Sequence, residues 1–247
     1  SSSNQTGKLL IYERQFQQGC YLEGNISDAN TSNAISGANI EILTTNINTS
    51  STILGDYVSG VANSGSYDIL FSKAAYISDT INAALNNGIL TTVNAQLVPL
   101  TPFSGNGIVT DITGNGIANA QVLIYNNDFT YTLTADQNGN FNVSNMYDGN
   151  YEVIAGQWGY NTVCTNESIT STNNNLTIVL PEGYYDDFTF DFGWSVSGGI
   201  TSNDPGVWER GSPEGTSDQG LNYNPDIDVS SDCFEYAYVT GLDAGSQ

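Results

Sequence analysis

The chain has 247 residues, which exceeds one typical domain and fits two comfortably, and its 39% of hydrophobic residues supply enough apolar surface for packed cores. Its 26 acidic and four basic residues leave a net charge of −22, which excludes a basic surface able to neutralise the phosphates of a nucleic acid. No apolar run approaches the roughly 20 residues of a spanning helix, so we predict no membrane span.

Residues 1–20 precede the first patterned segment, and we predict a linker or a strand there. From there on the chain repeats itself at a shift of 82 to 84 residues. The repeat predicts two related units, residues 21–100 and residues 103–181. Its most regular part alternates apolar and polar positions and aligns Ile35, Ala38, Ile40 and Ile42 with Ile117, Ala120, Val122 and Ile124.

Short alternating runs within each unit are separated by clusters of Gly, Asn and Asp, as at residues 111–116 and 136–140. Asn-Gly pairs supply the positive φ angles that tight hairpin turns need. Strands at this spacing, with one apolar face, indicate a small antiparallel β-sandwich of about 80 residues. Only the stretch from Ile81 to Leu90 has a helix-like pattern, and Asn86-Asn87-Gly88 interrupts it.

The composition changes after Pro181, because 13 of the 26 acidic residues lie in the last 66 positions. Aromatic or apolar side chains occupy every second position from Phe188 to Val196, which predicts a strand with one apolar face and a buried Trp194. A second strand is predicted at residues 234–239. Two or three strands cannot close a sandwich, so residues 182–247 are predicted to be a partial β region that further residues or another chain complete.

Neutral polar residues replace charges over most of the surface. The chain holds 30 Asn, 25 Ser and 24 Thr, whereas only 12% of its residues are charged. These residues favour turns and strand faces over helix interiors, which predicts a β-rich secreted protein. Because a secreted setting is oxidising and Cys164 lies near one end of the second unit, we expect Cys164 to pair with Cys233. Cys20 is then free or paired outside the segment.

Three motifs of the second unit carry a family resemblance, and they are Gly107 to Asp111, Asp136 to Phe141, and Asp148 to Val153 with the following Gly159-Tyr160. They resemble the opening strand, the Asp-x-x-Gly-x-Phe hairpin and the closing Gly-x-Tyr-x-Val and Gly-Tyr strands of carboxypeptidase regulatory-like domains. The resemblance implies two tandem seven-stranded antiparallel β-sandwiches of the transthyretin-like type. The first unit keeps Gly65-Ser66-Tyr67 but has Gly55-Asp56-Tyr57 in place of the full hairpin motif.

A second resemblance is carried by four segments of the last region, residues 187–188, 193–198, 208–213 and 237–241. They resemble the start of a jelly-roll module that follows such repeats in zinc carboxypeptidases exported by the type IX route. This resemblance implies a longer parent protein with an upstream catalytic domain as partner. The zinc site of that family needs a His-x-x-Glu pair and a later His, and this chain has no His. We therefore expect no zinc in this segment.

A loop dense in carboxylates is the candidate metal site. Asp226, Asp228 and Asp232 lie within seven positions, and Asp187 can approach them if the sheet folds back. Ca²⁺ takes six to eight hard oxygen ligands of this kind, so a calcium-stabilised loop is one interpretation. A solvated acidic loop is the other.

Trp158 stands beside Gly159 in a loop-like stretch, and with Tyr160 it is the candidate binding surface for a glycan or a protein. The sequence then favours a non-catalytic spacer and binding segment of a secreted or surface zinc carboxypeptidase-like protein. The alternative is a structural or adhesive extracellular protein whose sandwiches assemble with neighbouring subunits into a fibre or a surface layer.

Overall fold

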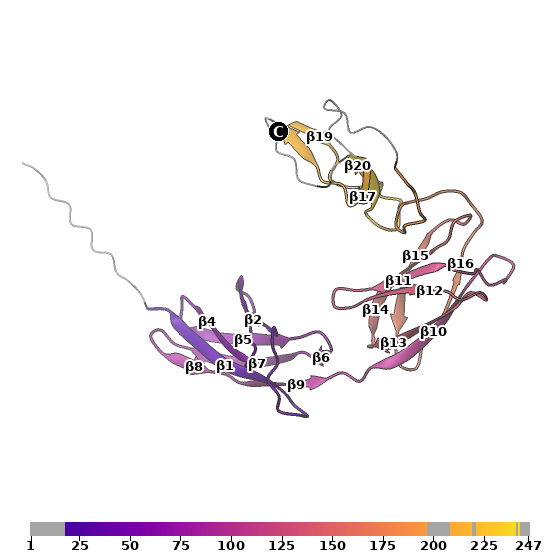
Figure 1. Cartoon of the computed structure of the whole chain (residues 1–247). Helices are drawn as coiled ribbons and strands as arrows, with labels where there is room; N and C mark the ends of the chain where they lie inside the picture. The colour runs from indigo at the N-terminus through magenta and orange to yellow at the C-terminus, as the bar shows by residue number, and fades with distance from the viewer. Residues whose placement is uncertain (1–17, 197–207, 219–220, 241, 243–247) are drawn as a thin grey trace, which may run out of the picture. The chain divides into compact units, whose positions relative to one another are not determined.

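Every regular element in the described part of the chain, residues 18–196, 208–218, 221–240 and 242, is a β-strand or an isolated bridge. The computed structural model divides into two compact units on either side of residue 100, and Figure 1 shows their described residues in indigo to magenta and in magenta to yellow. The prediction of an all-β chain with tandem sandwiches is confirmed. No helix among the described residues is long and apolar enough to cross a membrane.

The first unit is a sandwich of nine strands. They are β1 (Cys20–Asp28), β2 (Asn39–Ile42), β3 (Ile47–Ser50), β4 (Asp56–Val61), β5 (Gly65–Ser72), β6 (Tyr76–Ile77), β7 (Asp79–Leu85), β8 (Leu90–Thr92) and β9 (Ala95–Pro99). One sheet has the order β4-β1-β9-β6, with β8 also paired to β1, and the other has the order β3-β2-β5-β7.

The core of the first unit follows from strand alternation, because successive side chains of a strand point to opposite faces. On β2, Ile40 and Ile42 are fully buried and pair in register with Phe71 and Ile69 of β5, which are also fully buried. The intervening Glu41 is partly exposed. The opposite sheet contributes Leu22, Ile26 and Leu97 to the same core, so both inner faces are apolar.

The second unit begins with a seven-stranded sandwich. Its strands are β10 (Phe103–Thr110), β11 (Gln121–Tyr125), β12 (Thr130–Thr134), β13 (Asn140–Met146), β14 (Gly149–Gly156), β15 (Val163–Ile169) and β16 (Asn175–Val179). The sheets have the orders β13-β10-β16 and β12-β11-β14-β15. The core includes Val122, Ile124, Tyr151 and Ile178.

The two sandwiches have the same topology. Strand β1 lies between β4 and β9, as β10 lies between β13 and β16, and β2 lies between β3 and β5, as β11 lies between β12 and β14. Ile40 and Val122, which the repeat aligns, are both fully buried. Two details differ from a purely antiparallel seven-stranded pattern. Strand β1 pairs with β9, and β10 with β16, in parallel, and the first unit adds the short strands β6 and β8.

The helix-like stretch from Ile81 to Leu90 is not helical. Residues 79–85 form β7, which pairs with β5 over seven positions, and the chain then turns through Gly88 into β8. Pairing with β5 therefore overrides the helix-like pattern. A short isolated helix is only marginally stable, whereas the sheet gives the backbone of β7 hydrogen-bond partners along its length.

The predicted strand from Phe188 to Val196 is also absent. The described residues of this stretch form no ladder, and Phe188 has a positive φ of 56° that bends the chain. Phe190 is buried as the pattern requires, but Trp194 is 53% exposed, so the prediction that it is buried is wrong. After this bend come β17 (Trp208–Gly211) and β20 (Ala237–Thr240), which pair together, and β18 (Thr216–Asp218) and β19 (Leu221–Asn224), which form a second pair.

Two aspartates hold turns of the second sandwich. Asp111 accepts hydrogen bonds from the backbone N–H groups of Thr113 and Asn115 at 2.8 and 2.9 Å, and from the hydroxyl of Thr113 at 2.7 Å. Asp136 accepts from the backbone N–H groups of Asn138 and Asn140, both at 2.8 Å. Hydrogen bonds to the charged form lower the pKa of both carboxyl groups from the usual 3.8.

Acid should therefore destabilise the second unit. A carboxyl whose folded pKa lies below its unfolded pKa contributes stability that is present above about pH 3.8 and is lost as the pH falls through the folded pKa. We expect the melting temperature to fall on going from neutral pH to about pH 2, and Asp111→Asn to reduce that fall. Asp128→Asn is the control, since among the described residues its carboxylate accepts no hydrogen bond. An equal acid response in wild type and Asp111→Asn would contradict this account.

Candidate functional site: the C-terminal part of the second unit

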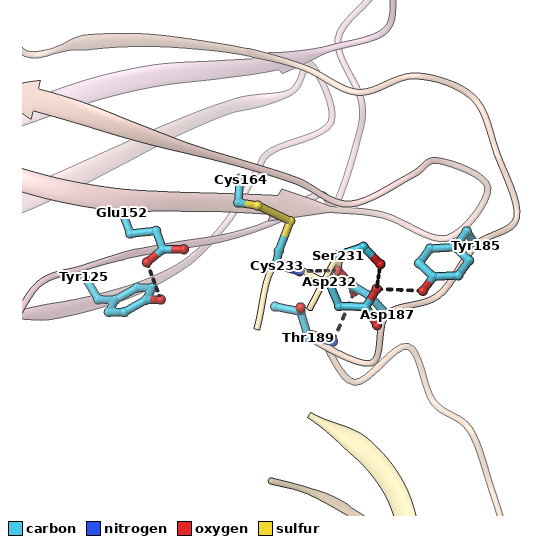
Figure 2. Close-up of a disulfide and its surroundings, with 9 residues drawn as sticks. All are labelled: Tyr125, Glu152, Cys164, Tyr185, Asp187, Thr189, Ser231, Asp232 and Cys233. Atoms are coloured by element: carbon cyan, nitrogen blue, oxygen red, sulfur yellow. Dashed lines mark hydrogen bonds between the residues drawn. A yellow bond between two sulfur atoms is a disulfide. The ribbon is translucent and has the colours of Figure 1, made fainter. Parts of the chain in front are cut away.

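The residues of the second unit that follow its sandwich, from residue 182 on, are called its C-terminal part. A disulfide joins this C-terminal part to the sandwich. Cys164 on β15 is joined to Cys233, which precedes β20, with the two Cα atoms 5.6 Å apart (Figure 2). This is the pair that the sequence analysis expected. Cys20 is free and buried at the start of β1. This bond spans 69 positions and holds Cys233 against β15, the edge strand of its sheet.

Asp187 and Asp232 lie beside this disulfide and serve as hydrogen-bond acceptors. The buried carboxylate of Asp187 accepts from the backbone N–H of Thr189 at 3.2 Å and of Cys233 at 3.4 Å. Asp232 accepts from the hydroxyl of Tyr185 at 2.6 Å. This hydrogen bond and the negative charge of Asp232 raise the pKa of Tyr185 to about 12. Figure 2 shows Tyr185 and Asp187 on the opposite side of the disulfide from Tyr125.

The proposed calcium ligands are only partly brought together. Asp187 and Asp232 both lie next to Cys233, whereas Asp226 is exposed beside Gly215. Asp228 has a buried Oδ2 atom without a described hydrogen-bond partner. In the described part of the chain, no three Asp, Glu, Cys or His side chains are grouped so that they could hold a metal ion. Calcium binding stays a prediction. It is tested by comparing the melting temperature of the chain in excess CaCl₂ with that in excess MgCl₂.

A pocket of about 610 Å³ lies between the sandwich and this C-terminal part. The sandwich contributes Tyr125 and Glu152, whose hydroxyl and carboxylate are joined by a hydrogen bond of 2.7 Å. Burial, this hydrogen bond and the nearby Glu235 raise the pKa of Tyr125. The ring of Phe234 packs edge-on against Tyr125, with centroids 5.8 Å apart. Residues 125, 152 and 227–236 are distant in sequence, so no local motif could have predicted this pocket.

An aromatic cluster is the second feature of this region, and we define it as Trp158, Tyr184 and Trp194. Trp158 contacts Tyr184 at 6.1 Å and Trp194 at 5.8 Å between ring centroids, with interplanar angles of 68° and 82°. The three side chains are 52%, 83% and 53% exposed, respectively. Trp158 is exposed, as the sequence analysis expected, and its ring contacts those of Tyr184 and Trp194. Its role in binding stays a prediction.

Backbone hydrogen bonds hold the cluster in place. The turn that carries Trp158 is tied to the segment before Tyr184, because Gly183 donates to the carbonyl of Gly159 at 3.0 Å. Asp186 accepts from Nε1 of Trp194 at 2.6 Å and from the backbone N–H of Phe188 at 2.9 Å. Tyr160, the other predicted binding residue, packs against the core of the sandwich and pairs with Glu182. Tyr160 therefore anchors the turn and is not part of the aromatic cluster.

Comparison with known proteins gives one family match. Residues 106–181, the second sandwich, match the sequence model of the carboxypeptidase regulatory-like domain. No curated protein sequence matches the chain.

Three solved pilins illustrate the structural matches, each at 12% identity. The Streptococcal ancillary pilin has a TM-score of 0.48 and is matched over 67% of this chain and 63% of its own. The shaft pilin SpaA of Lactobacillus rhamnosus GG has a TM-score of 0.32, with 69% and 99% covered. A minor pilin of Streptococcus agalactiae has a TM-score of 0.40, with 68% and 98% covered.

Proposed function

We propose that this chain is a non-catalytic spacer and binding segment of a secreted or cell-surface protein. The observation that carries the proposal is the repetition of one sandwich topology in both units, the second of which matches the regulatory-like family. The sandwiches act as spacers, and the C-terminal part with its exposed aromatic cluster acts as the binding region. The Cys164–Cys233 disulfide supports an oxidising extracellular setting.

In the first form of this proposal the segment belongs to a zinc carboxypeptidase-like parent exported by the type IX route. The family match over residues 106–181 supports this form, because regulatory-like domains carry the name of the peptidases that they accompany. The catalytic domain is then a partner of this segment and supplies the zinc ligands, since the 247 residues contain no His.

The second form is a structural or adhesive protein whose sandwiches assemble with neighbouring subunits. Tandem copies of one topology and a surface cluster of three exposed rings favour it. Sedimentation velocity over a range of concentrations distinguishes the forms. The accessory form predicts a monomer throughout, whereas the assembling form predicts particles that grow with concentration.

The 247-residue chain should neither hold stoichiometric zinc nor cleave peptides. We expect elemental analysis to find no equimolar zinc, and we expect no release of a C-terminal residue from peptides ending in Arg or Phe. The reason is that three Cys with wide spacing and no His offer no zinc site of the usual composition. Hydrolysis that a chelator abolishes, with one zinc per chain, would refute the non-catalytic proposal.

A further inference from the structure

The aromatic cluster has a geometry that suits a cation. Trp194 and Tyr184 stand at 82° and 68° to the ring of Trp158, so the three rings do not form one flat surface. The rings meet edge to face and each side chain remains at least half exposed. The face of an aromatic ring carries negative electrostatic potential, so the exposed ring faces attract a cation. A sugar ring, by contrast, stacks best on a flat face.

The charge around the cluster favours the same ligand. Residues 101–247 contain 19 acidic residues and one basic residue, Arg210. Asp186 is hydrogen-bonded to Trp194 itself and places a carboxylate at the edge of the cluster. Anionic ligands are repelled by this field, whereas cationic ligands are attracted and steered toward it.

The same unit already contains one contact of this kind. The guanidinium carbon of Arg210 lies 4.8 Å from the ring centroid of Tyr236. Arg210 also donates from Nη2 to the carbonyl of Thr189 at 3.3 Å, which fixes the side chain in that position. The single basic side chain of residues 101–247 is therefore engaged at Tyr236, so a cation that binds the aromatic cluster comes from outside this unit.

The size of the cluster limits the partner. The three aromatic side chains are each at least half exposed. Together they offer on the order of 400 Å² of accessible surface. A stable interface between folded proteins needs about 800 Å² on each partner. A short extended segment that inserts one or two basic side chains fits the smaller area.

We propose that the aromatic cluster binds an arginine-bearing segment of a partner protein, with a guanidinium group held against the rings of Trp158 and Trp194. This inference rests on the proposed binding role of the segment. Arginine fits better than lysine because its planar guanidinium stacks on aromatic faces and is weakly hydrated.

Calorimetric titration of the full chain with a blocked tetra-arginine peptide tests the proposal. The variants are Trp158→Ala, Trp194→Ala and Tyr184→Ala, and the matched control is Trp208→Ala, which is 54% exposed and belongs to no described ring pair. All four variants keep the net charge of −22, so general attraction to a cationic peptide is equal in each. The neutral tetra-citrulline peptide, cellotetraose and chitotetraose are the comparison ligands, and near-UV circular dichroism checks that each variant is folded.

We expect Trp158→Ala and Trp194→Ala to weaken tetra-arginine binding roughly five-fold or more, and Trp208→Ala to change it by less than about two-fold. Tetra-citrulline should bind roughly ten-fold more weakly or not at all. Tyr184→Ala keeps the test valid if a Trp variant fails to fold, because its 83% exposed side chain contributes little packing.

Three results would overturn the inference. The first is that the cluster variants and Trp208→Ala bind tetra-arginine with equal affinity. The second is that the citrulline and arginine peptides bind equally well. The third is that the chain binds a tetrasaccharide and not the peptide, and that Trp158→Ala abolishes this binding. The last result would keep the proposed binding role and change the ligand. Zinc-dependent hydrolysis, in contrast, would overturn the proposed function without affecting this titration.

Discussion

Replacing Cys164 and Cys233 with Ser should release the C-terminal part of the second unit while its seven-stranded sandwich stays folded. For a loop closed across 69 positions, the chain-entropy account gives a loss of about 4 kcal/mol. The loss falls on residues 182–240, because the sandwich has its own core. Trp158, Trp194 and Trp208 all lie in or against that part, so tryptophan fluorescence in a urea titration should report it. Far-UV circular dichroism should follow the sheets.

The wild-type chain under reducing conditions is the control, and it should reproduce the double variant. A single transition seen equally by both probes would show that the sandwich depends on the disulfide and would contradict the prediction. Peptide mapping without reduction identifies the bond directly. A peptide that joins Cys20 to either of the other two cysteines would refute the assignment.

Ile42→Ala and Ile124→Ala should each destabilise one unit by about 2–5 kcal/mol and leave the other unit unchanged. Both side chains are fully buried, and the 82-residue repeat aligns them, so each deletion leaves a cavity at the same place in its own sandwich. Calorimetry should resolve two melting transitions, of which each variant lowers one. The controls are Ile53→Ala and Ile112→Ala, whose side chains are 83% and 72% exposed and should cost little.

The two variants also test whether the units fold independently. If Ile42→Ala and Ile124→Ala lower the same transition, the units unfold together and residues 1–100 and 101–247 are not separate cooperative structures. A small effect of either variant, comparable with its exposed control, would contradict the assignment of equivalent cores.

The sequence predicted the sandwiches because two independent signals agree there. Alternation fixes which side chains of a strand face inward, and the internal repeat shows that the same alternation occurs twice. Ile40 and Val122 illustrate this, since both were identified by alignment and both are fully buried. The Asn-Gly pairs and the hairpin at Asp136 indicated where the strands end.

Alternation alone misled at residues 188–196. The pattern of aromatic residues there is that of a strand, but Asp186 and Asp187 accept hydrogen bonds from the N–H groups two residues later. These local bonds compete with a ladder and bend the chain at Phe188. Phe190 is then buried, and its ring lies where a side chain at Gly156 would have to be. Trp194 is left exposed as a result.

Sequence analysis identified single residues of the candidate site but not the contacts between them. Trp158 was identified because it stands beside Gly159 in a turn, and Cys164 and Cys233 because a secreted chain favours a disulfide. The pocket of Tyr125 and Phe234, and the contact of Trp158 with Trp194, join segments between about 36 and 110 positions apart in the sequence. Such contacts depend on how the C-terminal part packs on the sandwich, which no local pattern encodes.

The disulfide also decides how the second unit would carry a mechanical load. When tension is applied to the chain beyond residue 233, the bond passes the load directly to Cys164 on β15, and residues 165–232 carry none of it. That shielded stretch includes β16, so its five-residue parallel pairing with β10 is not sheared while the bond is intact. It also includes Tyr184 and Trp194, whereas Trp158 precedes Cys164 and stays in the loaded part of the chain. Reduction would send the load through β16 instead and would expose the β10–β16 pair to force, which makes the tensile strength of this unit dependent on the redox state of one bond.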